Sequence, residues 1–144
     1  MRATVAALAW ALWLALPAPA RGGDPAAEAP RSYRIATDGT TRRLSPGAEG
    51  RLVLAIVPQK GRHVNPAAPL QIVLSGTRGL KLSRRQLDHG DALDPGSDGP
   101  RFEVPFTATA AGAQKARAQL EFYVCSKEWC EKQVRDLTVP IRVE

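Results

Sequence analysis

The chain has 144 residues, with 20 Lys and Arg against 14 Asp and Glu, a formal net charge of +6, and two cysteines. This length suits one globular domain that is large enough to bury a core without depending on a disulfide. The basic excess leaves two alternatives, an anionic partner such as an envelope surface or nucleic acid, or a solvated basic surface. We favour the second and predict no nucleic-acid partner, because no nucleic-acid-binding module or aromatic stacking platform accompanies the charge.

Residues 1–20 have the pattern of a secretory signal peptide. Arg2 precedes an apolar run over 3–16, and the segment 17–20 ends in small residues at positions −3 and −1. We therefore expect cleavage after Ala20, a mature chain with a charge of about +5 because Arg2 is lost, and a periplasmic or secreted location. The apolar run is shorter than the roughly 20 residues that span a bilayer, and no later segment is apolar enough, so no transmembrane segment is expected in the mature chain. No cysteine follows the cleavage site, which argues against a lipoprotein.

Residues 21–32 are rich in Gly, Ala and Pro and contain no bulky apolar side chain. We expect a flexible leader there, with order beginning near Tyr33 and one folded domain over 33–144. From Tyr33 on, short apolar runs are separated by turn residues at fairly regular spacing. This pattern is typical of an all-β sandwich or barrel.

The first strands are predicted from apolar runs and alternation. Residues 52–57 are continuously apolar, which predicts a strand buried on both faces, whereas 70–75 and 101–108 alternate as strands covered on one face do. Pro105 indicates an edge position in the last of these, because it cannot donate a hydrogen bond to a neighbour. Residues 79–82 form a shorter candidate strand, and we expect 83–100 to be a long loop or edge excursion with one helical turn.

The two cysteines, Cys125 and Cys130, are separated by four residues that include Trp129, the only tryptophan after the signal peptide. In a helix, positions i and i+5 would lie roughly 140° apart, so a helix cannot bridge them. Two strand ends flanking a four-residue turn face each other at a separation close to what a disulfide needs. The spacing therefore favours a disulfide at the tip of a hairpin.

The register of this hairpin follows from the cysteine pair. If Cys125 stands opposite Cys130, antiparallel pairing places Ala118 opposite Leu137 and Ala116 opposite Val139, which aligns the apolar rows of both strands. Cys125 then lies on the opposite, less buried face of its strand.

Near the tip, the same register places Gln133 and Arg135 on the core row. Because these side chains are polar, we expect the sheet to fray into the loop there.

Three roles are open for Cys125 and Cys130: an inert staple, a redox pair that exchanges with a partner's thiols, and a metal site completed by His63 and His89. A loop of about six residues gives only about 2 kcal/mol of stabilisation in the chain-entropy relation, so the bridge is a weak stabiliser. Metal binding fits no recognised spacing, and an oxidising compartment converts such thiols to a disulfide. His63, in the segment 61–66, is the type of isolated histidine that commonly serves as a turn or packing residue.

No arrangement typical of a serine or cysteine hydrolase, no phosphate-binding glycine loop and no paired-carboxylate motif is present in the sequence. The sequence therefore argues against a hydrolase or a nucleotide-dependent enzyme. No cofactor and no metal are expected.

The order of several motifs resembles the N-terminal periplasmic domain of the thiol:disulfide interchange protein DsbD and its disulfide bond corrector relatives. The resemblance covers residues 52–144 and rests on the order of five features: a first strand, Gly61-x-His63 with prolines after it, the strand 102–106, the segment 122–130 with Cys125 and Cys130, and a final Val-rich strand. It implies an immunoglobulin-like antiparallel β-sandwich. It departs from the family at Arg62, where relatives carry Trp, and at 131–133, where they carry an aromatic or Leu followed by two prolines.

The resemblance also implies a function, in which one cysteine pair passes electrons from a membrane-linked reductase to periplasmic or envelope thiol-disulfide proteins. Cys125 and Cys130 would be the catalytic residues, with Cys130 forming mixed disulfides and Cys125 resolving them. Because the transmembrane and thioredoxin-like domains of DsbD are missing from this chain, the reductase would be a separate protein. The alternative is a non-catalytic envelope binding or structural module whose disulfide is inert.

Overall fold

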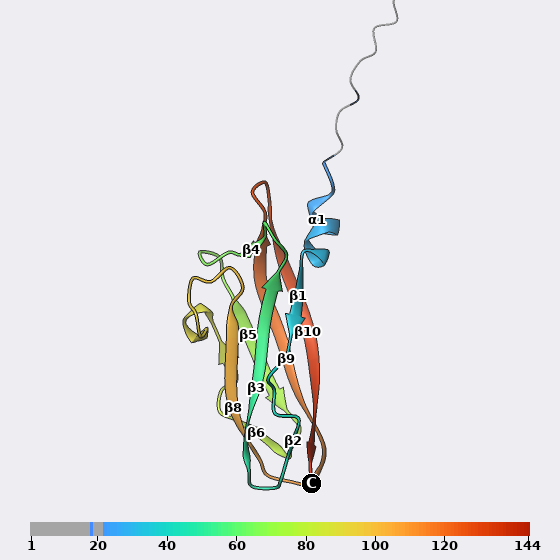
Figure 1. Cartoon of the computed structure of the whole chain (residues 1–144), viewed down its shortest axis with the longest axis vertical. Coiled ribbons are helices and arrows are strands. Elements are labelled where there is room, and N and C mark those ends of the chain that lie inside the picture. The colour runs from blue at the N-terminus through green and yellow to red at the C-terminus, as the bar shows by residue number, and fades with distance from the viewer. Residues whose placement is uncertain (1–17, 19–21) are drawn as a thin grey trace, which may run out of the picture.

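The computed structural model describes residue 18 and residues 22–144, so the predicted signal peptide lies outside the described residues apart from Ala18. Strands dominate the described chain, and the helical elements are short (Figure 1). The helical elements are α1 (Pro25–Glu28), η1 (Ala29–Arg31) and η2 (His89–Asp91). The strands are β1 (Tyr33–Ala36), β2 (Arg43–Leu44), β3 (Glu49–Pro58), β4 (His63–Val64), β5 (Gln71–Gly76), β6 (Leu80–Leu82), β7 (Gln86–Leu87), β8 (Arg101–Ala108), β9 (Gly112–Cys125) and β10 (Cys130–Val143).

These strands form two packed sheets. A four-stranded sheet has the order β1-β3-β8-β6, and a six-stranded sheet has the order β2-β10-β9-β5-β7, with β4 paired to β9. Omitting the two-residue strands, the seven remaining strands follow the A-B-E-D and C-F-G arrangement of an immunoglobulin constant domain. The predicted all-β, immunoglobulin-like antiparallel sandwich is therefore confirmed.

The core lies between the sheets and is built by the alternating rows that the sequence predicts. In β8, and in β9 from Ala116 to Val124, every second side chain is buried, and the side chains between them are exposed or half-buried. Ile72 and Leu74 form the buried row of β5. The largest fully buried side chains are Phe102, Phe106, Phe122, Leu52, Leu54, Ile56, Ile72, Leu120, Ile141, Val53, Val104 and Val124. Burying aliphatic and aromatic side chains of this size contributes about 1.5 to 3 kcal/mol each, which makes this layer the main source of stability.

The prediction that 52–57 is buried on both faces is confirmed over 52–56, and Val57 is half-buried. The outer face of β3 is covered by the segment between β1 and β2. There the Thr40 hydroxyl accepts a hydrogen bond from the Val53 amide at 2.9 Å and donates to the Val53 carbonyl at 3.3 Å. This contact supplies the second cover that a continuously apolar strand requires.

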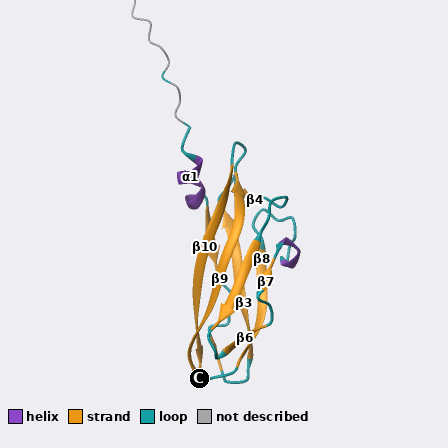
Figure 2. Cartoon of the chain, turned by 180° about the vertical axis from the view of Figure 1, so that it is seen from behind, coloured by secondary structure: helices purple, strands orange, loops and turns teal. Residues whose placement is uncertain are grey.

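Strands β9 and β10 form one long hairpin that reaches the tip of the molecule, as Figure 2 shows from behind. Cys125 pairs with Cys130, Ala118 with Leu137, and Ala116 with Val139, so the predicted register is confirmed. The ladder continues without interruption from the cysteine pair to the pair formed by Gly112 and Val143.

The expected fraying near Gln133 and Arg135 is wrong, because both residues remain in the ladder, opposite Phe122 and Leu120. Gln133 is 8% exposed, and its Oε1 accepts a hydrogen bond from the Tyr33 hydroxyl at 3.1 Å. The guanidinium of Arg135 lies over the Tyr33 ring, 5.6 Å from its centroid. Tyr33 thus supplies the polar partner that allows a glutamine on the core row.

Regular structure begins before Tyr33, earlier than the sequence predicts. The Asp24 side chain caps α1 by accepting a hydrogen bond from the Ala26 amide, and Pro25 occupies the first helical position. Ala29 is fully buried, so a small side chain anchors this segment where no bulky one is present.

The region 83–100 contains β7 and the single turn η2, in agreement with the predicted excursion and helical turn. The edge position expected at Pro105 is wrong. Strand β8 lies between β3 and β6, but β6 pairs only with its last three residues, from Phe106 to Ala108. Next to that pairing, the Pro105 carbonyl oxygen accepts a hydrogen bond from the Ser83 amide at 2.9 Å, and Pro105, which has no N–H, cannot return one.

Candidate functional site

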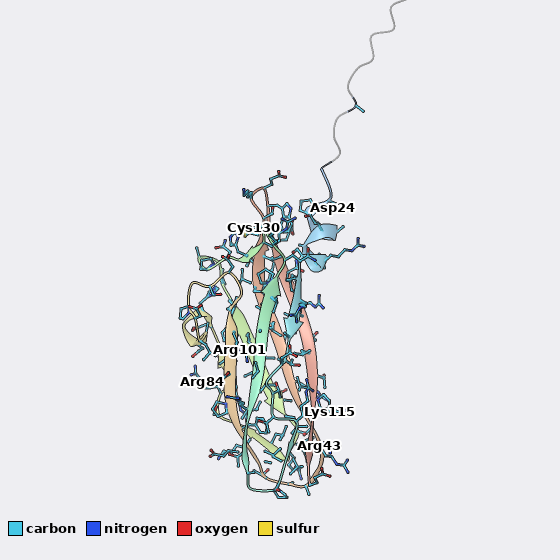
Figure 3. The ribbon with its side chains drawn as sticks, in the orientation of Figure 1. Asp24, Arg43, Arg84, Arg101, Lys115 and Cys130 are labelled. Carbon is cyan, nitrogen blue, oxygen red and sulfur yellow. A yellow bond between two sulfur atoms is a disulfide. The ribbon has the colours of Figure 1, made fainter. Side chains whose placement is uncertain are left out.

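The cysteines form the predicted disulfide at the tip of the β9–β10 hairpin, at the end of the molecule that also carries Asp24 (Figure 3). Cys125 ends β9 and Cys130 begins β10, with 4.1 Å between their Cα atoms. Opposed residues this close are typical of the pairs in an antiparallel ladder that exchange no hydrogen bonds with each other. The bridge therefore crosses the strands at a position where the ladder itself provides no hydrogen bond.

The two sulfur-bearing residues differ in exposure. Cys130 is exposed, whereas Cys125 is only 1% exposed. Cys125 lies on the predicted, less buried face of β9 with the half-buried Tyr123, but Cys125 itself is buried there, which the sequence did not predict. The cause is β4, which pairs with β9 on the side opposite to β10 and places His63 directly across from Cys125. Paired residues project from the same face of a sheet, so Cys125 has the side chains of two neighbouring strands beside it.

The tip loop is held by its own hydrogen bonds. The Ser126 hydroxyl accepts from the amides of Glu128 and Trp129 at 3.0 and 3.1 Å, and the Ser126 amide donates to the Trp129 carbonyl at 2.8 Å. Hydroxyl-to-backbone bonds of this kind form a local turn without any disulfide. The loop is therefore ordered by the disulfide and by Ser126 together.

Trp129 links the tip to the body of the molecule. Its ring is partly buried against the core, and the Arg62 guanidinium lies 5.4 Å from the ring centroid. The Nη2 of Arg62 also forms an ion pair with Glu28 Oε1, which joins α1 to the turn before β4. These residues, with Gly61 and 126–128, line a pocket of about 280 Å³. A cation–π contact combined with an ion pair fixes the position of the indole beside the disulfide.

Two polar side chains, Asn65 and Lys132, lie near the cysteines. Asn65 follows β4, and its Nδ2 lies 4.0 Å from the Cys130 sulfur, while its backbone amide donates to the Tyr123 carbonyl at 2.9 Å. Lys132 Nζ lies 2.6 Å from Glu121 Oε1, and the hydrogen bond to this carboxylate raises the pKa of Lys132. Because its charge is already paired with Glu121, Lys132 offers little electrostatic support to a thiolate at Cys130.

The histidines considered as metal ligands have separate roles. His63 stands opposite Cys125, whereas His89 lies in η2, where its Nε2 is 2.8 Å from the Ala68 carbonyl oxygen. Both cysteines are committed to the disulfide. Within residues 22–144 no three His, Cys, Asp or Glu side chains are grouped to hold a metal ion.

Several residues that shape the site were not singled out by sequence reasoning. Arg62 attracted notice only as a departure from the DsbD-like pattern, and Glu28 and Asn65 carry no spacing signal toward the cysteines. Their contacts arise from α1 and β4, which are too short to produce a periodic pattern. Of the residues that shape the site, Trp129 was the one that the sequence could indicate, because it is the one large aromatic side chain between the cysteines.

No protein family and no curated protein matches this sequence. Seven of the solved structures that it resembles share 10 to 18% identity with it. An Escherichia coli alpha-2-macroglobulin shares 17% identity at a TM-score of 0.49, with 78% of this chain and 7% of that chain covered. Domains 4 and 5 of the S-layer protein SbsC share 13% identity at a TM-score of 0.46, and the match covers 76% of this chain and 50% of that chain. A lipoprotein from Bacteroides thetaiotaomicron shares 16% identity at a TM-score of 0.42, and the match covers 76% of this chain and 78% of that chain.

The disulfide bears on the location of the protein. A disulfide at this position is maintained in oxidising, extracytoplasmic compartments, and the cysteines carry no metal-binding alternative in the described structure. Among the described residues, no helix has the length and apolar character needed to cross a membrane.

Proposed function

We propose that this protein is a non-catalytic binding or structural module of the cell envelope, whose disulfide holds the β9–β10 tip in one conformation. The observation that carries the proposal is the fixed position of Trp129, which rests on the core, under Arg62, in a loop bonded through Ser126. A tip that presents a positioned aromatic side chain has little entropy to lose when it contacts a partner. Within this proposal the signal peptide delivers the chain to the periplasm or the exterior.

The burial of Cys125 also favours an inert bridge. Reducing the disulfide would release a thiolate at Cys125, and burying an ion away from water disfavours the charged form. A poor leaving group slows thiol-disulfide exchange and resists reduction. The bridge then protects the end of the hairpin, where a strand pair otherwise frays first.

The second candidate is thiol-disulfide exchange of the DsbD-like type, and the exposure of Cys130 specifically favours it. In such a step a partner thiolate would attack the Cys130 sulfur, forming a mixed disulfide as the bond between Cys125 and Cys130 breaks. The electron pair of that bond would leave on Cys125, which then takes a proton. His63 stands opposite Cys125 in the β4–β9 ladder, which makes its imidazole the candidate donor of that proton.

A trapping experiment separates the two candidates. Cys125→Ser and Cys130→Ser variants are expressed in the native envelope, thiols are blocked by acid and alkylation, and mixed disulfides are detected by mass. The module proposal expects neither variant to trap an envelope protein. The exchange candidate expects Cys125→Ser, which keeps the accessible Cys130, to trap a partner in much larger amounts than Cys130→Ser. That asymmetric result would overturn the module proposal.

A further inference from the structure

A second site lies away from the disulfide, on the side of the sandwich where β5 of one sheet passes β6 of the other. These two strands belong to different sheets, so no ladder closes the space between them. A pocket of about 570 Å³ opens there, with a floor formed by Leu74, Leu80 and Leu82. Figure 1 shows β6 near the end of the molecule opposite to the tip, so this groove is separate from the site described above.

All charged residues that line the groove are basic. Arg78, Lys81 and Arg85 line it together with the hydroxyl residues Ser75, Thr77 and Thr109, and none of its lining residues is acidic. Across residues 22–144, none of these three cations has a carboxylate within 4.0 Å, whereas the adjacent Arg84 is paired with Asp91 at 2.9 Å. Unpaired like charges around one cavity raise its positive potential, which attracts an anion.

The turn that carries Arg78 is built on a fixed frame. The Thr77 hydroxyl donates to Gln114 Oε1 at 2.5 Å, and the Gly79 amide donates to the same oxygen at 3.2 Å. The Thr109 hydroxyl donates to the Arg78 carbonyl at 3.2 Å, and the Arg85 carbonyl accepts from the Leu74 amide at 2.8 Å. The backbone positions of both arginines are therefore set before any ligand arrives, which lowers the entropic cost of binding.

We propose that this groove binds phosphate groups. A guanidinium offers paired N–H donors that match two phosphate oxygens, and two arginines with a lysine can neutralise more than one negative charge. The groove volume leaves room for a group larger than a single phosphate. The phosphates could be carried by an anionic lipid headgroup or by a soluble polyphosphate, which share the chemistry that the groove recognises.

The test compares two triple variants that carry the same change of charge. Arg78→Gln, Lys81→Gln and Arg85→Gln together remove the rim, and Arg31→Gln, Arg34→Gln and Lys60→Gln serve as the control at exposed positions outside the groove. Binding of inorganic tripolyphosphate is measured by calorimetry, and binding of phosphatidylglycerol vesicles by sedimentation. Both use buffer of about 50 mM salt, where screening is modest. Thermal melts check that all three proteins are folded.

We expect the rim variant to bind at least about tenfold more weakly than the wild type, and the control to lose less than about threefold. If the rim variant binds tripolyphosphate more weakly than the wild type, free phosphate is sufficient as the ligand. If the rim variant binds only the vesicles more weakly, a lipid headgroup is the source of the phosphate. An equal loss in both variants would show a response to net charge only and would overturn the site. The site would also be overturned if the wild type bound neither probe at concentrations up to about 1 mM, because the binding free energy of a weaker site is less than about 4 kcal/mol.

Discussion

At the scale of single residues, Tyr33 has the most consequential position in the core. Its ring meets Phe122 edge-on at 5.0 Å, its hydroxyl donates to Gln133, and Arg135 lies over its outer face. Burial raises the pKa of Tyr33, because desolvation disfavours the phenolate, and the charge and hydrogen bond of Arg135 offset this only in part. Tyr33 thus ties the first strand of the domain to the last.

This arrangement predicts an alkaline loss of stability. An unfolded tyrosine ionises near pH 10, whereas folded Tyr33 holds its proton to higher pH. The contribution of Tyr33 is therefore fully present below about pH 10 and declines as the pH rises toward the folded pKa. Urea melts of the wild type and Tyr33→Phe between about pH 8 and 11 should converge at the alkaline end. Curves that stay parallel over that range would contradict the assignment.

Phe122 and Tyr123 provide a paired test of the core rows. Phe122 is fully buried, so Phe122→Ala should cost about 3 to 5 kcal/mol by leaving a cavity. Tyr123 is half-buried on the opposite face, and Tyr123→Ala should cost much less. Urea denaturation of the two variants measures both values. Equal losses would mean that the outer face of β9 is covered as tightly as its inner face.

At the scale of elements, the disulfide closes a hairpin that a long ladder already holds in register. Its loss should therefore remove only about 2 kcal/mol of global stability. The larger effect should be local. After reduction, the amides of Ser126 and Trp129 should exchange with solvent much faster, while the amide of Val139 in the body of β10 should be unchanged.

Hydrogen-exchange mass spectrometry of the oxidised and reduced protein tests this prediction. The double variant Cys125→Ser with Cys130→Ser is the control for effects of the reductant. Faster exchange along the whole of β10, in place of a change confined to the tip, would show that the bridge supports the sheet and not only its end.

The alternation of apolar residues allowed the sequence to predict the elements of the central sandwich. In β8 and β9 every second side chain must face the core, so the strands and their buried rows follow from the alternation of apolar residues. The pairing of Ala118 with Leu137 follows from placing Cys125 opposite Cys130. Strand β4 has two residues and no measurable period, so its cover over Cys125 could not be predicted. Gln133 stays in the ladder as a buried residue because Tyr33, one hundred positions away, donates a hydrogen bond to it, and local sequence patterns carry no information about such a contact.

At the scale of the whole molecule, two features lie at separate places on one rigid sandwich. The tip combines the disulfide, Trp129 and the pocket beneath Arg62, and the basic groove lies between β5 and β6. The immunoglobulin-like order of the strands holds both in place without using either cysteine to join the sheets. Under the two proposals made above, the module would contact a phosphate-bearing component through the groove and a partner through the tip.

The central claim is that the disulfide between Cys125 and Cys130 is structural, and its reduction potential tests this claim most directly. The folded protein is equilibrated in graded thiol buffers, and free thiols are counted by alkylation and intact mass. Structural bridges in exported proteins lie below about −300 mV, and 30 mV corresponds to about 1.4 kcal/mol. We predict a midpoint below about −300 mV, with the pair oxidised in every buffer of the glutathione range. A midpoint near that of the exchanging pairs, at about −120 to −270 mV, would contradict the claim and establish Cys130 as an accessible redox cysteine.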